Sequence, residues 1–298
     1  MAFQHAERRD GTPRMNNQSQ RPAMGTRSHF ADIILALSIA AFSCLYYLAV
    51  RTHAGQRLDA SAVRAPEVLR VSQFRLAVRM HDWVSVVSIA FLGGAIVVVA
   101  FVRRRPRQAI ASGIIMTGST ITSEVIKHTW SRPFLRVNDS LGHHNTFPSG
   151  HTTVAMALGV GAIVVASAAS RRRVAPLAAV FASVVGASLV ATASHRPSDI
   201  MGAAVVVLGW AAAVSLVMQR AGLRRRPEAD DEPSGAWLTI SGLLLMLLGF
   251  AAAGIIIIAA HIQRLPTIPI GRTFLASASA ITGTVFICIA GVVRLQRD

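Results

Sequence analysis

The sequence predicts an all-α integral membrane protein, and three observations lead to that prediction. Hydrophobic residues make up 52% of the 298 residues and charged residues only 15%, a balance too apolar for an ordinary soluble domain. The apolar residues occur in long blocks, and about 20 such residues cross about 30 Å of hydrocarbon as one helix. The blocks have almost no polar face, which argues against buried helices of a soluble core.

Eight of these blocks are long enough to be transmembrane helices. They lie at residues 31–50, 83–102, 109–126, 152–170, 174–193, 200–218, 236–260 and 274–293. The first block follows a basic N-terminus, as a secretory signal does, but it is longer than the roughly 7–15 apolar residues of a signal core. We therefore expect a retained anchor, preceded by a disordered basic cytoplasmic tail at residues 1–30.

The formal net charge is +16, and eleven of the 30 lysine and arginine residues are arginines clustered in short segments between the apolar blocks. These arginines lie at positions 103–105, 107, 171–173, 220 and 224–226. Short basic loops stay on the cytoplasmic side, so both termini are expected in the cytoplasm. The placement indicates membrane lipids as partners and not nucleic acid. Cys44 and Cys288 fall inside predicted spans, so neither a disulfide nor a metal site is expected from them.

Two segments outside the spans have a distinctive composition. Residues 51–82 mix apolar side chains with arginines, which fits either an interfacial segment or an ordinary solvated loop. Residues 219–235 form a charged stretch that we interpret as a cytoplasmic linker. Two further transmembrane helices then follow within residues 236–298.

Most candidate catalytic groups are expected at one membrane surface. Successive spans alternate in direction, so the end of the third span, the start of the fourth and the junction of the fifth and sixth lie on one side. These positions hold Lys127, His151 and His195. The arginine-rich loops lie on the other side, so the three residues are expected to face outward.

The segment Pro148-Ser149-Gly150-His151 directly precedes the fourth span. Ser149 suits a helix N-cap, and Gly150 lets another group approach the backbone closely. The free N–H groups and positive dipole end of a helix start favour an anion such as phosphate. His151 is placed there to give or take a proton. The alternative is a membrane-interface histidine after a capping turn.

His195 and Asp199 are four residues apart at the expected start of the sixth span. A carboxylate at that spacing can hold one imidazole nitrogen and leave the other unprotonated and nucleophilic. Arg196 adds a positive charge beside them, and Pro197 suits the first helical turn. The alternative is a capping aspartate with a histidine and an arginine that reach to the interface.

Lys127 is the single lysine among 30 lysine and arginine residues, which suggests a specific role. Lys127 and Arg132, with Arg136 as a third candidate, have the charge needed to hold phosphate oxygens. The alternative is that they only snorkel at the end of a span.

The three segments together resemble the type 2 phosphatidic acid phosphatase superfamily, also called lipid phosphate phosphatases. The family pattern is Lys, six residues, Arg-Pro; then Pro-Ser-Gly-His; then Ser-Arg, five residues, His, three residues, Asp. Residues 148–151 match the second motif in full, and His195 with Asp199 match the core of the third. The resemblance covers residues 31–218 and implies a six-helix lipid-phosphatase-like core.

The resemblance also implies a chemistry, with His195 as the nucleophile that forms a phosphohistidine. Asp199 would orient His195, and His151 would protonate the leaving oxygen. The phosphate would be held by Lys127, Arg132, Ser149 and Gly150, with no metal and no cofactor. The substrate would be a lipid phosphate or a polyprenyl diphosphate, hydrolysed on the outer face of a bacterial inner membrane.

Two departures from the family pattern stand out. Only four residues separate Lys127 from Arg132, and the arginine of the third motif is replaced by Leu189. Arg196 is predicted to supply the missing charge to phosphate, with Arg136 as the other candidate. The alternatives to a phosphatase are a phosphotransferase on the same scaffold and a weakly active member that serves as a non-enzymatic membrane protein.

Overall fold

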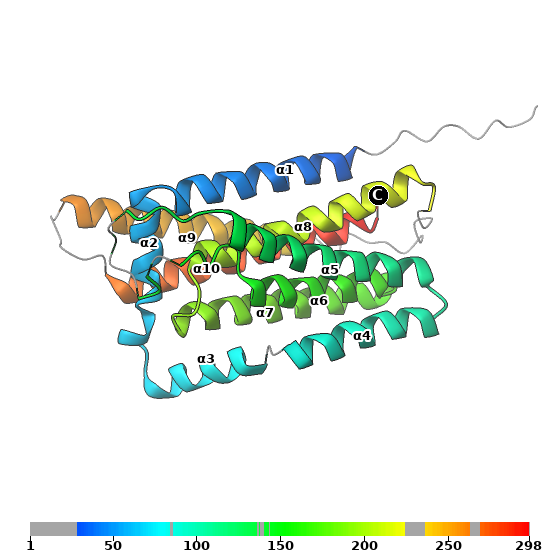
Figure 1. Cartoon of the computed structure of the whole chain (residues 1–298), viewed down its shortest axis with the longest axis horizontal. Helices are drawn as coiled ribbons and strands as arrows, with labels where there is room; N and C mark the ends of the chain where they lie inside the picture. Colours follow the sequence, from blue (N-terminus) through cyan, green and yellow to red (C-terminus); the bar gives the residue numbers. More distant parts are fainter. Residues whose placement is uncertain are drawn as a thin grey trace, which may run out of the picture.

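The computed structural model describes residues 29–83, 86–135, 137, 140–142, 144–223, 236–262 and 269–297. Within these residues every regular element is a helix, which confirms the predicted all-α class (Figure 1). The α-helices are α1 (Phe30–Leu45), α2 (His53–Val63), α3 (Val71–Trp83), α4 (Val86–Val102), α5 (Pro106–Thr129), α6 (Gly150–Val165), α7 (Ala168–Ala191), α8 (Pro197–Arg220), α9 (Ala236–Ile262) and α10 (Ile270–Leu295). Nearly all of the predicted tail and residues 224–235 of the predicted linker lie outside the described residues.

Six of the described helices are long and apolar enough to cross a membrane. They are Phe30–Val50, which joins α1 to a π-helical turn, together with α5, α7, α8, α10 and the Ala236–Ala259 part of α9. The predicted spans 83–102 and 152–170 correspond to shorter apolar helices, Phe91–Val102 within α4 and Gly150–Val165. The chain is therefore an all-α, multi-pass integral membrane protein.

The boundary between α6 and α7 differs from the prediction. We expected the arginines at 171–173 to form a loop, but they lie in the first turns of α7. The helical conformation is interrupted at Ala166 and Ser167. The Ser167 Oγ accepts a hydrogen bond from the Ser170 backbone N–H at 3.3 Å. This serine cap begins the helix before the apolar run that hydropathy detects.

Within residues 51–82, the second half of α2 is buried by other protein segments, which neither predicted alternative anticipated. Ala60, Ala62 and Val63 are each at most 4% exposed. The helix packs against α8 and α10 at one end of the bundle. Hydropathy could not show this, because α2 is buried by other protein segments and not by lipid.

Helices α6, α7, α8 and α10 are the most buried part of the bundle, and α5 packs on α6 and α8. Helix α1 packs on α8, α4 packs on α5 and α6, and α3 packs on α7 (Figure 1). Small residues line the contacts, as they do where membrane helices approach closely. A Cβ at Gly159 of α6 would lie 2.8 Å from the Ala178 Cβ of α7.

The last two helices form a hairpin in which α10 is the inner member. Helix α10 packs on α7, α8 and α2, and α9 packs mainly on α10. A Cβ at Gly249 of α9 would lie 2.6 Å from the Ala276 carbonyl oxygen of α10, so the two backbones approach closely. Leu244, Leu247 and Leu248 of α9 are each more than 60% exposed, as residues facing lipid would be.

The two ends of the bundle differ in their chemistry. At one end, Arg105 donates to the Val165 carbonyl at 3.3 Å, Arg107 to the Leu223 carbonyl at 3.4 Å and Arg171 to the Ala166 carbonyl at 3.3 Å. At the other end lie the C-terminus of α5 and the N-termini of α6 and α8. The segments that carry the three motifs thus meet opposite the arginine-rich end.

Candidate functional site

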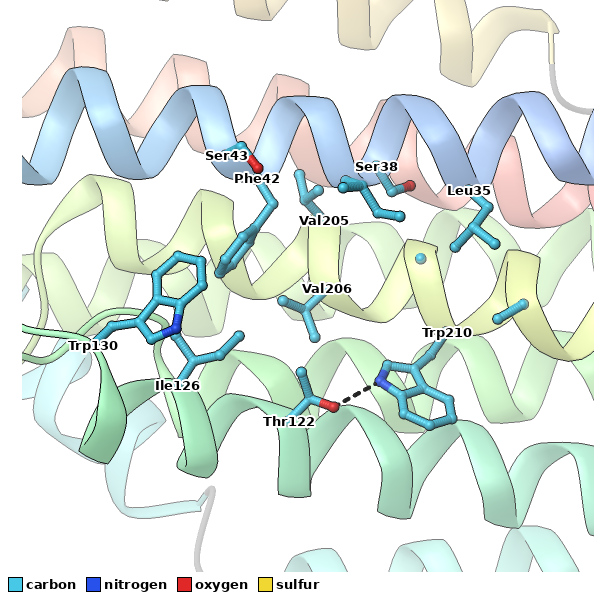
Figure 2. Close-up of a pocket in the computed structure, with 13 residues that line it drawn as sticks. Leu35, Ser38, Phe42, Ser43, Thr122, Ile126, Trp130, Val205, Val206 and Trp210 are labelled. Carbon is cyan, nitrogen blue, oxygen red and sulfur yellow. Dashed lines mark hydrogen bonds between the residues drawn. The ribbon is translucent and has the colours of Figure 1, made fainter.

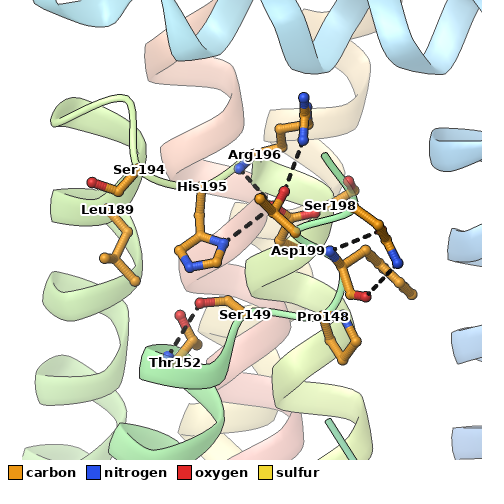
Figure 3. Close-up of polar contacts among 12 residues, drawn as sticks. Pro148, Ser149, Thr152, Leu189, Ser194, His195, Arg196, Ser198 and Asp199 are labelled. Carbon is orange, nitrogen blue, oxygen red and sulfur yellow. Dashed lines mark hydrogen bonds and ion pairs between the residues drawn. The ribbon is translucent and has the colours of Figure 1, made fainter. Parts of the chain in front are cut away.

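The second motif forms the capped start of α6 and is joined to the third motif. The Ser149 Oγ accepts a hydrogen bond from the Thr152 backbone N–H at 3.3 Å (Figure 3). The Ser149 backbone N–H donates to the Asp199 carbonyl oxygen at 3.0 Å. Ser149 is completely buried, so the capping turn is rigidly held against the start of α8.

Lys127 lies over the N-terminal end of α6, although its spacing from Arg132 departs from the family pattern. A Cβ at Gly150 would lie 3.3 Å from the Lys127 Nζ and 2.8 Å from the Glu124 Oε1. A side chain at this position would require the ends of the Glu124 and Lys127 side chains to move. The Lys127 ammonium also forms a 2.6 Å ion pair with Glu124, one helical turn earlier. Sequence analysis missed Glu124, which shares the Lys127 face of α5 through an i, i+3 spacing.

The third motif forms a compact polar network around the Asp199 carboxylate. His195 Nδ1 lies 3.3 Å from the Asp199 Oδ2 (Figure 3). The same oxygen accepts hydrogen bonds from the Arg196 backbone N–H at 2.9 Å and from the Thr146 hydroxyl at 2.6 Å. Asp199 is completely buried and His195 is 8% exposed. The network fixes the direction of the imidazole, as expected for a histidine that carries out chemistry.

The two motif histidines lie close to each other. The ring centroids of His151 and His195 are 6.1 Å apart, and the ring planes are inclined by 64°. One imidazole comes from the start of α6 and the other from the turn before α8. The arrangement can present a nucleophile and a proton donor to one group bound between the two helix starts.

Arg196 is held in a way that the sequence did not predict. Its guanidinium donates to the Gly142 carbonyl at 3.0 Å, the His144 carbonyl at 3.4 Å and the Thr146 Oγ1 at 2.7 Å. Arg196 is completely buried. The geometry therefore favours a role in fixing the loop before α6, and not the predicted role of phosphate ligand. Arg136, the other predicted source of charge, lies outside the described residues.

Arg132 lies beside an acidic residue that sequence analysis missed. The Arg132 Nη2 is 3.9 Å from the Asp59 Oδ2 of α2, and both side chains are at most 5% exposed. Asp59 also accepts hydrogen bonds from the Ser198 hydroxyl at 2.6 Å and the Ser198 backbone N–H at 3.2 Å. Polar Gln56 and Asp59 share a helix face with Ala60 and Val63, a pattern that signals a buried polar contact.

The electrostatic surroundings of Asp59 are unusual for an aspartate. Its pKa is raised from 3.8 to about 6, mainly by burial and also by the nearby Asp199 carboxylate. The charge of Arg132 and the hydrogen bond from Ser198 act in the opposite direction. Asp59 therefore sits within the electrostatic reach of both the first and the third motif.

Leu189, which replaces the third-motif arginine, is packed into an apolar cluster. It is completely buried with Ile200 of α8 and Ile281 of α10. The Leu189 carbonyl accepts hydrogen bonds from the backbone N–H groups of Ser194 at 2.8 Å and His195 at 3.1 Å. The position thus still shapes the turn before His195, while α10 helps to fill the space around its side chain.

A family comparison agrees with this site. Residues 108–223, which run from α5 to the end of α8, match the model of the PAP2 superfamily. The match confirms the resemblance to the type 2 phosphatidic acid phosphatase superfamily over these residues. Helices α1 to α4, α9 and α10 lie outside the matched segment. No curated protein and no solved structure matches the chain.

We predict that Arg196→Ala destabilises the fold as well as the site. The change would leave two loop carbonyls and the Thr146 hydroxyl without their buried donor, and breaking such a network typically costs about 3–5 kcal/mol. The measurement is the thermal unfolding midpoint in detergent, with the exposed Arg173→Ala as the control for loss of an arginine. An unchanged midpoint for Arg196→Ala would contradict the loop-fixing role.

Proposed function

We propose that the protein is a membrane phosphatase that hydrolyses a lipid phosphate or a polyprenyl diphosphate through a phosphohistidine on His195. The observation that carries the proposal is the network in which Asp199 orients His195 beside the capped start of α6 and His151. The family match supports phosphate-ester hydrolysis in general. The substrate, the membrane face and the mechanism are our proposals.

The reaction would take place in two displacements. Asp199 accepts a hydrogen bond from His195 Nδ1–H, which leaves Nε2 unprotonated. Nε2 attacks phosphorus, and the bond from phosphorus to the lipid oxygen breaks. His151 gives a proton to the leaving oxygen. His151 then takes a proton from a water molecule as that water attacks the phosphohistidine. The P–N bond breaks, and inorganic phosphate leaves with His195 and His151 regenerated.

Three groups are suited to stabilise the charge on the transferring phosphoryl group. Lys127 lies over the N-terminal end of α6, where backbone N–H groups and the helix dipole favour an anion. The Ser149-Gly150 turn presents that helix end. Arg132 supplies a guanidinium, whose planar fork matches phosphate oxygens. Because Lys127 pairs with Glu124, a bound phosphate would have to compete with that carboxylate.

A cavity between three apolar helices supports a lipid substrate. It has a volume of about 360 Å³ and lies between α4, α5 and α6. Its lining includes Thr120 and Val154, which lie about one helical turn below Glu124 and His151. Ile121, also in the lining, is 57% exposed, so the cavity adjoins the surface that faces lipid. A hydrocarbon chain could occupy it while the phosphate reached the motif residues.

A second cavity, shown in Figure 2, lies on another side of α5. It has a volume of about 330 Å³ between α1, α5 and α8, and Phe42, Trp130 and Trp210 contribute to its walls. None of the predicted site residues lines it. We therefore assign the chemistry to the motif residues and not to this cavity.

The first test is phosphate release by the purified protein in detergent with EDTA present. Phosphatidic acid, phosphatidylglycerol phosphate, and polyprenyl phosphates and diphosphates form the substrate panel. We expect release from at least one of them, and a loss on the order of 10⁴- to 10⁶-fold in His195→Asn, as when a catalytic nucleophile is removed. The exposed His53→Asn is the matched control.

Several results would count against this assignment. Full activity in His195→Asn would exclude a phosphohistidine at that residue, and restoration of activity only by a divalent ion would contradict metal-free chemistry. Transfer to an added alcohol without phosphate release would favour the phosphotransferase alternative. No turnover of any substrate in the panel would favour a non-enzymatic role.

We further propose that the site faces outward from a bacterial inner membrane with both termini in the cytoplasm. The proposal rests on the arginine-rich opposite end of the bundle. Single cysteines at Ser140 and Leu223, in a background with Cys44 and Cys288 replaced by serine, report the orientation. Ser140→Cys should react with an impermeant thiol reagent on intact cells, and Leu223→Cys only after permeabilisation. The reverse pattern would overturn the outward orientation.

A further inference from the structure

Helix α2 is anchored at the motif end of the bundle, although it lies outside the segment that matches the family model. The Thr52 Oγ1 caps it by accepting a hydrogen bond from the Gly55 backbone N–H at 3.0 Å. Gln56 donates to the carbonyls of Val50 at 2.8 Å and Pro133 at 2.9 Å. The second bond joins α2 to the residue that follows Arg132. The helix thus has a fixed position relative to the first motif.

Asp59 extends that link to the third motif. Its carboxylate receives both hydrogen bonds from Ser198, which lies in the first turn of α8, next to Asp199 and three residues after His195. It also attracts Arg132 across 3.9 Å. At this distance the pair is electrostatic and not a hydrogen bond, so the carboxylate orients the guanidinium through its charge.

A buried carboxylate is a costly way to join two helices. Removing a carboxylate from water carries a large penalty unless it is well paired, and the raised pKa of Asp59 reflects this penalty. A neutral side chain could accept a hydrogen bond from Ser198 at lower cost. The negative charge therefore has a use beyond fixing α2 to α8. The Arg132 guanidinium lies 3.9 Å away, and its charge acts on Asp59 more strongly than that of Arg196.

We propose that Asp59 is a positioning residue that holds the Arg132 guanidinium at the His195 end of α8, where it can bind the phosphate of the substrate. The inference rests on the proposed function. The positioning role of Asp59 makes α2 part of the site. It also explains how the Arg132 guanidinium is oriented in a chain where Leu189 stands in place of the third-motif arginine. The Arg196 guanidinium is hydrogen-bonded to the loop before α6. Phosphate binding therefore depends more strongly on the orientation of Arg132 than on Arg196.

A double-mutant cycle with tungstate, a tetrahedral oxyanion that mimics phosphate, tests this role. Tungstate affinity is measured by calorimetry in detergent for the wild type, Asp59→Asn, Arg132→Gln and the double variant. Asp59→Asn should weaken tungstate binding about 10-fold, the scale expected when one charge-assisted hydrogen bond from Arg132 to the anion is lost. The same change should have little effect in the Arg132→Gln background, because Asp59 acts through Arg132.

Thermal stability separates positioning from a purely structural role. Asp59→Asn removes a buried charge, so its unfolding midpoint should equal or exceed that of the wild type. Ser61→Ala is the matched control on the same helix, since the Ser61 hydroxyl donates to the nearby Leu58 carbonyl, at 2.8 Å. We expect Ser61→Ala to leave tungstate affinity unchanged.

Each other outcome has a definite meaning. A lower midpoint with unchanged affinity, or an equal loss of affinity in both backgrounds, would overturn the proposal. Tighter tungstate binding by Asp59→Asn would also overturn it, because the carboxylate would then compete with the anion for Arg132. If the cycle shows coupling but the wild type releases no phosphate, the proposed function fails and the positioning role stands. A wild type that binds no tungstate and releases no phosphate contradicts both.

Discussion

The site depends on one buried carboxylate, that of Asp199 in the first turn of α8. Its Oδ2 accepts hydrogen bonds from the Arg196 backbone N–H and the Thr146 hydroxyl, and it faces His195 Nδ1 at 3.3 Å. Burying such a charge is tolerated because these donors and the positive end of the helix dipole compensate it. The same carboxylate thus caps the helix, holds the preceding loop and orients the histidine. Changes to any one of these contacts would affect the other two.

The rest of the bundle brings further groups to this point and keeps them in place. Ser149 connects the start of α6 to the Asp199 backbone, and Gly150 allows Lys127 to lie over that helix start. Helix α10 packs behind α7 and α8 and contributes Ile281 to the cluster around Leu189. The two C-terminal helices therefore support the turn that carries His195, a role for which the sequence offered no account.

The sequence was most informative where the chemistry is local. Apolar block length predicted the membrane class, and the four-residue spacing of His195 and Asp199 predicted their contact. It was less informative for contacts made across the bundle. Arg196 is adjacent to His195 in the chain but binds the loop before α6, and Asp59 joins the site from a segment whose hydropathy suggested an interface or a solvated loop. Such contacts depend on how distant segments pack, which neither composition nor spacing encodes.

The central claim is that His195 carries the phosphoryl group between the two halves of the reaction. The most direct test is rapid quenching at neutral or alkaline pH during turnover of phosphatidic acid with a radiolabelled phosphate, followed by peptide mass mapping. The account predicts label on the peptide that contains His195, and none on that of Asp199→Asn, in which the imidazole loses its orienting carboxylate. Label on His151, or full turnover without any labelled peptide, would contradict it.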